Sequence, residues 1–247
     1  MLNTQHPFSL WLSLTMRSDV HIGVIIPAGG SGKRFGSPIP KQYLPVVGIP
    51  SIVRSVVTVL DLQQCSSIVI AAAEDQHGHL RDLLATFNVN DTRIHIVGGG
   101  NERQISVAKA LRHDSLASGD IIAVHDAVRP LATRSLWELV IHTAHVCGAA
   151  IPAIPVADTL KRVSGDVVVE TINRADFRRI QTPQAFDSAV LRRAYQVADE
   201  DGWTGTDCAS LCERLGIVVH CVEGEESNIK ITTPFDVVIA EAFLARN

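Results

Sequence analysis

Apolar and polar positions along this chain fall into blocks that favour strands and helices in turn. Short runs that are apolar almost throughout are typical of strands covered on both faces of a parallel sheet. Such runs predict strands over residues 21–26, 67–72, 93–97, 120–124, 149–154 and 217–222. Longer stretches between them have helical spacing and predict helices over residues 51–60, 80–87, 102–111, 135–146, 187–198, 207–215 and 234–246.

Strands that alternate with helices predict an α/β fold, a Rossmann-like open sheet that is mostly parallel. Residues 156–171 differ, because polar and apolar residues alternate there around Ser164-Gly165-Asp166. This pattern predicts a β-hairpin arm inserted in the sheet order. Ligands of open α/β sheets bind beyond the carboxyl ends of the strands. The rule points to three turns, at residues 27–36, 98–106 and 125–130.

The length of 247 residues and the 46% of hydrophobic residues are ordinary for one α/β domain. We expect this domain to span residues 20–247 and residues 1–19 to be a disordered N-terminal extension. The apolar run Phe8–Leu14 has no basic segment before it and no small-residue cleavage site after it, so it makes a poor signal peptide. It is also too short to span a bilayer.

Charge and cysteine content narrow the class of protein further. The formal net charge of −4 gives no basic surplus for nucleic-acid binding. The five cysteines are odd in number and contain no CxxC pair, which favours free thiols in a reducing compartment. These features predict a cytoplasmic protein that binds neither nucleic acid nor a membrane.

The turn after the first predicted strand reads PAGGSGKRFG over residues 27–36. Glycines let backbone N–H groups approach an anion, and the two cations of the loop can neutralise phosphate charge. The glycine spacing fits neither the G-x-G-x-x-G dinucleotide fingerprint nor the Walker A loop. By itself the turn could equally be a structural glycine turn with solvated cations. The nearby PKQYL segment, which contains Lys41, adds weight to the phosphate-binding interpretation.

Further motifs follow in order along the chain. They are GGNERQISV at 99–107, VHDAVRP at 124–130, PVADTLK at 155–161, Arg174, TPQ at 182–184, Thr206-Asp207 and NIKIT at 228–232. Together with the first two segments they resemble the 2-C-methyl-D-erythritol 4-phosphate cytidylyltransferase family, over roughly residues 21–245. The chain departs from the family's pattern at Asn101, where many members carry Asp, and at Val128, where Ala is usual.

The resemblance implies a transfer of CMP from CTP to 2-C-methyl-D-erythritol 4-phosphate, with release of pyrophosphate. It implies catalytic roles for Arg34, Lys41 and Lys230. It assigns nucleotide binding to the glycine turn, the cytosine-binding segment and the aspartate of VHDAVRP, which are Ala28, Gly29, Gly30, Ser31, Gly32, Gly100, Asn101, Ser106 and Asp126. Ser106 could instead serve only the first turn of a helix.

The resemblance assigns binding of the acceptor to a second set of residues, which are Asp126, Arg129, Thr159, Arg174, Thr182 and Lys230. The family resemblance also implies a homodimer in which Thr159 and Arg174 of the arm complete the partner's site. The expected cofactor is Mg²⁺ or another divalent cation, held mainly through the CTP phosphates, with Asp126 as a candidate ligand. His125 is expected to be structural, because no step needs its proton.

Two alternatives stay open at this point. Ribitol 5-phosphate cytidylyltransferases resemble the same motifs, and inspection of the sequence separates the two acceptors only weakly. A non-catalytic nucleotide-binding regulatory protein on the same fold is the alternative of another class. The charged set of Arg34, Lys41, Asp126 and Lys230 speaks against it, because binding alone would not require all four.

Overall fold

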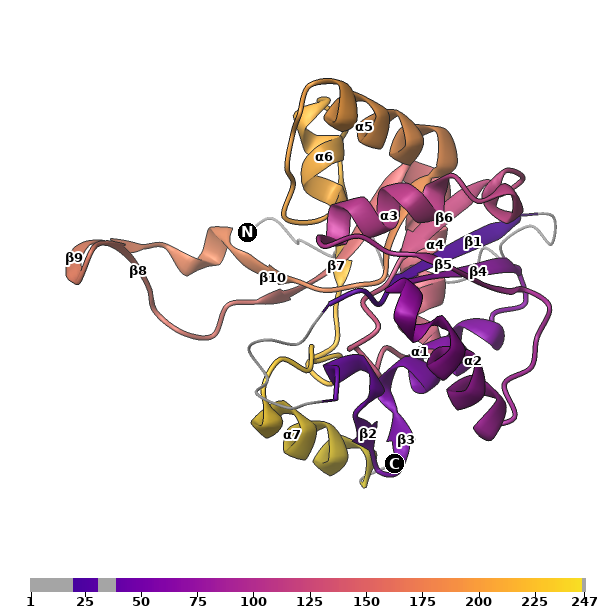
Figure 1. Ribbon diagram of the computed structural model, residues 1–247. Helices are drawn as coiled ribbons and strands as arrows, with labels where there is room; N and C mark the ends of the chain where they lie inside the picture. The colour runs from indigo at the N-terminus through magenta and orange to yellow at the C-terminus, as the bar shows by residue number, and fades with distance from the viewer. Residues whose placement is uncertain (1–19, 31–38, 246–247) are drawn as a thin grey trace.

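The computed structural model of the protein describes residues 20–30 and 39–245 (Figure 1). The expected N-terminal extension and the second half of the glycine turn lie outside these residues. The site residues predicted there are Ser31, Gly32 and Arg34.

The centre of the fold is a mixed, mostly parallel sheet of eight strands with the order β10-β7-β11-β6-β1-β4-β5, in which β12 also pairs with β7. Its strands are β1 (Ile22–Pro27), β4 (Cys65–Ala72), β5 (Ile94–Gly98), β6 (Ile121–Val124), β7 (Ala149–Pro155), β10 (Arg178–Ile180), β11 (Gln184–Asp187) and β12 (His220–Glu223). This architecture confirms the predicted α/β class.

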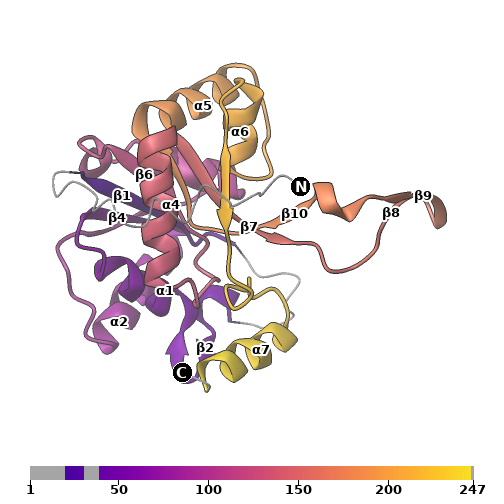
Figure 2. The same cartoon turned by 180° about the vertical axis from the view of Figure 1, so that it is seen from behind.

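Helices cover both faces of the sheet, as Figures 1 and 2 show from opposite sides. One face carries α1 (Ser51–Leu60), α2 (His77–Thr86) and α4 (Arg134–Cys147), which pack into the larger of the two main hydrophobic clusters. The other face carries α3 (Arg103–Leu111), α5 (Ser188–Glu200) and α6 (Cys208–Arg214). Short 3₁₀ helices lie in the connections, namely η2 (Lys41–Tyr43), η3 (Glu74–Gln76), η4 (Asp114–Leu116) and η5 (Arg174–Asp176).

The alternation within β1 explains why the fold needs both helical layers. Val24 and Ile26 point into the cluster of α1, α2 and α4, whereas Ile25 points into the cluster of α3, α5 and α6. All three side chains are fully buried. Because burying such a side chain contributes about 1.5–3 kcal/mol, the strand is stabilised from both faces.

Two strands of the sheet were not predicted. β10 and β11 are antiparallel to their neighbours, and β11 lies between β6 and β7. They have three and four residues, too few for a period of two to stand out against the polar residues around them. The sequence predicts that the last strand begins at residue 217, but β12 begins at His220. The reason is that the Ile217 N–H donates to the Cys212 carbonyl and closes α6.

A third, smaller cluster lies beside the sheet. It joins the short ribbon of β2 (Pro45–Val46) and β3 (Ile49–Pro50) to α7 (Pro234–Leu244). Thr233 caps α7 by accepting a hydrogen bond from the Asp236 N–H, and Pro234 occupies the first turn as the sequence predicts. No helix among residues 20–30 and 39–245 is long and apolar enough to cross a membrane.

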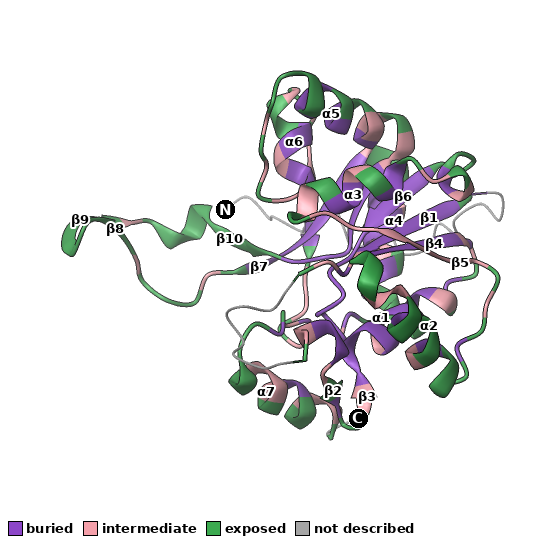
Figure 3. Cartoon of the chain, in the orientation of Figure 1, coloured by how far each residue is buried: buried purple, intermediate pink, exposed green. Residues whose placement is uncertain are grey.

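The predicted hairpin is present, but it forms a separate two-stranded sheet of β8 (Leu160–Ser164) and β9 (Val167–Ile172). Gly165 turns the chain with a φ of 58°, a conformation that L residues adopt only at a cost. The arm projects from the body of the protein in both views, and its residues are mostly exposed (Figures 1–3). It therefore has almost no contact with the central sheet.

Candidate functional site

A cavity of about 130 Å³ lies where the carboxyl ends of β1, β5 and β6 meet. This is the edge that the sequence predicts for a ligand. The cavity brings together most of the predicted site residues that the structure describes, which are Ala28, Gly29, Gly30, Lys41, Gly100, Asn101, Ser106, Asp126 and Lys230. A larger cavity of about 340 Å³ beside α1 and α7 contains none of them and is lined mainly by apolar residues.

The described part of the glycine turn is fixed by backbone and side-chain hydrogen bonds. The Ala28 N–H donates to the Ala71 carbonyl of β4 over 2.7 Å. The Ala28 carbonyl accepts a hydrogen bond from Gln42 Nε2, also over 2.7 Å. Because Gln42 is the middle residue of η2, this bond holds the preceding Lys41 at the rim of the cavity.

The second loop of the cavity follows β5 and touches the first. A Cβ atom on Gly29 would lie 3.1 Å from the Gly100 carbonyl oxygen, and one on Gly100 would lie 2.3 Å from Ile105 Cγ2. Position 100 therefore requires glycine, whereas a side chain at position 29 would be in tight contact with the Gly100 carbonyl. The hydroxyl of Ser106 accepts from the Gly100 N–H over 3.0 Å and donates to the Glu102 carbonyl over 3.0 Å. Ser106 thus lies in the first turns of α3, the alternative noted above, and it also orders the loop.

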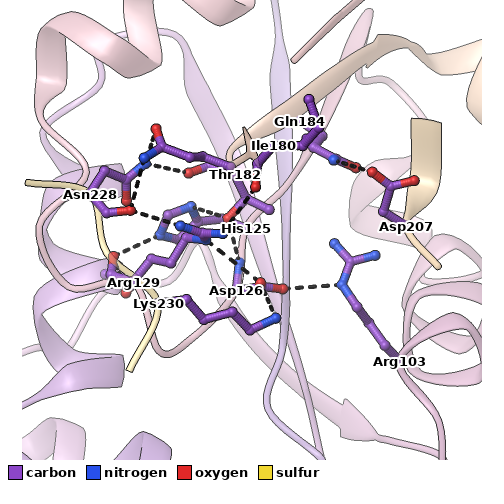
Figure 4. A network of polar contacts seen from close by, with 12 residues as sticks. Arg103, His125, Asp126, Arg129, Ile180, Thr182, Gln184, Asp207, Asn228 and Lys230 are labelled. Atoms are coloured by element: carbon purple, nitrogen blue, oxygen red, sulfur yellow. Dashed lines mark hydrogen bonds and ion pairs between the residues drawn. The ribbon is translucent and has the colours of Figure 1, made fainter. Parts of the chain in front are cut away.

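Asp126 is the centre of the polar network in Figure 4. It follows β6 and is buried, with 7% of its surface exposed. Its Oδ1 atom accepts a hydrogen bond from Arg103 Nε at 3.1 Å. Its Oδ2 atom lies 2.8 Å from Lys230 Nζ and 3.8 Å from Arg129 Nε. Three cations therefore converge on one carboxylate.

These cations decide the charge of the cluster. Burial alone would raise the pKa of Asp126, but Arg103 and Lys230 lower it well below the usual value. Burial likewise opposes the charge of Arg103, and the neighbouring Cys208 and Asp126 raise its pKa above the usual value. With one carboxylate among three cations, the cluster keeps a net positive charge, which is suited to phosphate groups.

His125 lies beneath Asp126 and is fully buried. Its Nε2 atom lies 3.0 Å from the Arg129 carbonyl, which can only accept, so Nε2 carries the proton. Nδ1 then accepts from the Thr182 hydroxyl at 3.1 Å, and the same hydroxyl accepts from the Asp126 N–H at 3.0 Å. Burial lowers the pKa of His125 to about 4. The neutral ring and its use of both nitrogens agree with the predicted structural role.

Arg129 is held mainly by backbone carbonyls. Its NH1 atom donates to the Asn228 carbonyl over 2.7 Å and its NH2 atom to the Ile180 carbonyl over 3.4 Å. The Asn228 side chain in turn donates to the Thr182 carbonyl over 2.9 Å. These bonds tie the segment that carries Lys230 to the segment that carries Thr182, so four stretches of chain meet around Asp126.

Thr159 and Arg174 are not part of this cluster within one chain. Thr159 is exposed on the arm, and Arg174 is exposed at its base, where NH1 donates to the Ala157 carbonyl. Asp207, from the Thr206-Asp207 motif, is the N-cap residue of α6 and accepts from the Ser210 N–H over 2.9 Å. Its role in the described structure is therefore helix capping.

One residue of the cluster was missed from the sequence. Arg103 is part of the GGNERQISV segment, but no role was assigned to it. It is the first residue of α3, and its side chain extends to Asp126. A usable signal was present, because an arginine at the start of a helix beside a glycine loop opposes the helix dipole and needs a carboxylate partner.

The oxygen donors of the cavity bear on the expected divalent cation. Glu102 and Asp126 are the carboxylates that line the cavity, and among the described residues no cluster of three or more metal-ligating side chains occurs. Mg²⁺ commonly binds one or two carboxylates and completes its shell with phosphate oxygens and water. Two carboxylates therefore suit a cation that is bound mainly by nucleotide phosphates, and they suit a cation bound by protein side chains alone less well.

The sequence of this chain is similar to those of proteins of one known family. The profile of the family described as 2-C-methyl-D-erythritol 4-phosphate cytidylyltransferase matches residues 22–246. A protein of that name from Bacillus mycoides (strain KBAB4) is 39% identical over 221 residues, which are 90% of this chain and 96% of the relative. One from Syntrophus aciditrophicus (strain SB) is 41% identical over 224 residues, covering 90% and 95%.

Solved structures lead to the same family. The crystal structure of the cytidylyltransferase from Thermus thermophilus superposes with a TM-score of 0.75 at 33% identity and covers 92% of this chain and 100% of that one. The 4-diphosphocytidyl-2C-methyl-D-erythritol synthase of Anaerococcus prevotii DSM 20548 gives a TM-score of 0.79 at 31% identity, covering 92% and 97%. This chain belongs to the 2-C-methyl-D-erythritol 4-phosphate cytidylyltransferase family.

Proposed function

We propose that the cavity around Asp126 transfers CMP from CTP to 2-C-methyl-D-erythritol 4-phosphate, the reaction of the family in the non-mevalonate route to isoprenoids. The observation that carries the proposal is the convergence of Arg103, Arg129 and Lys230 on the carboxylate of Asp126, beside a glycine turn. Two phosphate-bearing anions must approach each other in this reaction, and a preorganised positive cluster removes much of their repulsion.

The chemical step is a substitution at the α-phosphorus of CTP. An oxygen of the acceptor's phosphate forms the new bond to that phosphorus, and the bond to the β-phosphate oxygen breaks, so pyrophosphate leaves. The attacking oxygen is already anionic and needs no general base. Catalysis by positioning and charge neutralisation is therefore sufficient, in keeping with a His125 that stays neutral and fully hydrogen-bonded.

We assign the nucleotide to the glycine turn and to the loop after β5. The N–H groups of residues 28–32 bind the phosphates, while Arg34 and Lys41 neutralise charge on the triphosphate and on the α-phosphate in the transition state. Gly100, Asn101 and Ser106 bind the cytosine. All three residues line the cavity, which supports this assignment.

Asp126 and Lys230 both line the cavity. We assign Asp126 to the nucleotide and the acceptor, and Lys230 to catalysis and the acceptor. Arg129 and Thr182 lie one layer deeper, at 9% and 5% exposure. Arg129 acts on the acceptor phosphate through the charge of its guanidinium. Thr182 acts on it indirectly, because its hydroxyl fixes the position of the Asp126 backbone. Mg²⁺, held by the CTP phosphates with Asp126 as its protein ligand, would supply further neutralisation of the triphosphate.

The arm supports a homodimer with shared sites. Four apolar side chains of the arm are exposed to solvent in the described chain, which are Val163, Val167, Val168 and Val169. A two-fold exchange of arms would bury them with one patch serving both subunits. Thr159 and Arg174 would then complete the partner's acceptor site. The five free cysteines agree with the cytoplasmic location that we propose.

The test of this function is pyrophosphate release from CTP with two acceptors compared side by side. We expect turnover with 2-C-methyl-D-erythritol 4-phosphate and kcat/KM at least about 10²-fold lower with ribitol 5-phosphate, because a site built to hydrogen-bond one polyol leaves polar groups unpaired with another. The reverse preference would identify the ribitol enzyme. Tight CTP binding without turnover on either acceptor would indicate the regulatory alternative.

A further inference from the structure

The guanidinium of Arg103 is held from two sides in the described structure. Its Nε atom donates to Asp126 Oδ1 over 3.1 Å, and its NH1 atom donates to the sulfur of Cys208 over 3.3 Å. Its third nitrogen, NH2, is buried and has no hydrogen-bond partner among the described residues. Among the described residues, Asp126 and the sulfur of Cys208 are therefore the hydrogen-bond partners of this guanidinium.

Cys208 is itself fixed to the sheet that carries Asp126. It is fully buried, and its Sγ atom lies 3.3 Å from the hydroxyl of Tyr195 on α5. Its N–H donates to Gln184 Oε1 over 3.2 Å. Gln184 pairs with Val124 of β6, two residues before Asp126. The sulfur and the carboxylate are thus both anchored to neighbouring strands, and Arg103 bridges them.

We propose that Cys208 is a positioning residue, which acts through Arg103 to orient the carboxylate of Asp126. A guanidinium is a planar fork, so fixing NH1 also fixes the direction of the Nε–H bond. Without the sulfur, the guanidinium is free to turn its plane and leave Asp126 Oδ1. This inference rests on the cytidylyl transfer proposed above, because it assumes that Asp126 lies at the reacting groups.

The chain offers a matched control on the same helix. Cys212 lies one turn further along α6 and is as fully buried as Cys208, but no hydrogen bond of its sulfur is observed among the described residues. Replacing either cysteine by alanine removes the same atom from the same helix and leaves a similar cavity. Differences between the two variants then report the polar contacts of the Cys208 sulfur with Arg103 and Tyr195, and not the loss of packing.

The experiment compares Cys208→Ala, Cys212→Ala and Cys208→Ser for thermal unfolding, CTP affinity by calorimetry and pyrophosphate release. We expect similar losses in Tm for the two alanine variants. We expect kcat/KM to fall about 10-fold and CTP affinity several-fold in Cys208→Ala only, because small misplacements of a reacting group have effects of this size. Cys208→Ser keeps a polar acceptor at this position, so this variant should retain part of kcat/KM and part of the CTP affinity. Equal effects of the two alanine variants on kcat/KM and on CTP affinity would overturn the proposal.

A double-mutant cycle tests the route through Arg103. Arg103→Ala should lower kcat/KM strongly, and adding Cys208→Ala should then change it less than about twofold, since residues that act through each other are not additive. Additive losses would show that Cys208 acts elsewhere and would overturn the inference. CTP binding needs no turnover, so the calorimetric comparison decides the role of Cys208 even if the reaction itself is another one.

Discussion

Lys230 places its ammonium nitrogen 2.8 Å from Oδ2 of Asp126, although one residue follows β12 and the other follows β6. The side chain of Lys230 is 40% exposed, whereas that of Asp126 is 9% exposed. The pair therefore connects the buried polar network to the open cavity. This arrangement holds the carboxylate ionised and presents a cation to whatever binds beside it.

The first prediction concerns this ion pair. Lys230→Met keeps the aliphatic stem but removes the charge, so the pKa of Asp126 should rise and the positive field at the cavity should weaken. We expect kcat to fall about 10²-fold, as for other preorganised charge stabilisers. The measurement is pyrophosphate release under saturating substrates.

A surface cation is the control for this variant. Arg134 on α4 lies at the surface and forms an ion pair with the exposed Glu138, so Arg134→Met should leave turnover within about twofold. If Lys230→Met kept normal turnover while folded, Lys230 would have no part in the reaction.

The second prediction concerns the layer beneath Asp126. Thr182→Val is nearly isosteric but leaves the buried Asp126 N–H and His125 Nδ1 without their partner. We expect a loss of about 1–3 kcal/mol in the free energy of unfolding, measured with urea, together with reduced turnover. Thr143→Val on α4 is the control, because the buried Thr143 hydroxyl donates only to the Leu139 carbonyl of its own helix. Equal losses in the two variants would contradict the assigned role.

The third prediction is a pH dependence of stability. Burial lowers the pKa of His125 to about 4 in the folded protein. An unfolded histidine has a pKa of about 6.5, so the unfolded state binds more protons between these values and stability falls as the pH drops from about 6.5 to 4. Across this whole pH range, the free energy of unfolding falls by up to about 3 kcal/mol. Asp126, whose folded pKa is lowered, loses its own contribution only at still lower pH.

Urea unfolding at several pH values, without nucleotide or divalent cation, measures this effect. His125→Gln should flatten the curve between pH 6.5 and 4. His145→Gln changes an exposed histidine of α4 and should keep the slope of the natural protein. A natural protein with no slope in this range would mean that His125 binds its proton equally readily in the folded and unfolded states.

The fourth prediction concerns the shared site. Arg174→Ala and Lys41→Ala should each be nearly inactive, but mixed dimers contain one site with both defects and one with neither. Random exchange of subunits should then recover about a quarter of the natural activity. No recovery despite demonstrated heterodimers would place Arg174 in its own chain's site. A monomer at micromolar concentration in light scattering would refute the dimer.

The sequence predicts the layers of this fold well because most of its strands are long apolar runs. β4 and β6 are covered on both faces, and the composition alone reveals them. β10 and β11 stay hidden because pairing with β7, and not their own pattern, makes them strands. The start of β12 is set instead by the hydrogen bond from the Ile217 N–H to the Cys212 carbonyl, which closes α6.

The site was predictable to the extent that it lies in contiguous motifs. Asp126 stands out because it follows a buried strand at the ligand edge of the sheet. Cys208 was missed because its contact with Arg103 joins two helix starts that are distant in the chain. No local pattern encodes such a contact, and cysteine in a helix more often indicates packing.

Product formation by the natural protein and by Asp126→Asn shows whether the Asp126 cluster carries out the cytidylyl transfer. CTP and 2-C-methyl-D-erythritol 4-phosphate are incubated with each protein, and 4-diphosphocytidyl-2-C-methyl-D-erythritol is quantified by mass spectrometry. Asparagine keeps the shape but removes the charge that orders Arg103 and Lys230, so we predict product from the natural protein and a rate lower by about 10²-fold or more from a folded Asp126→Asn. No product from the natural protein, or equal rates from both, would contradict the account.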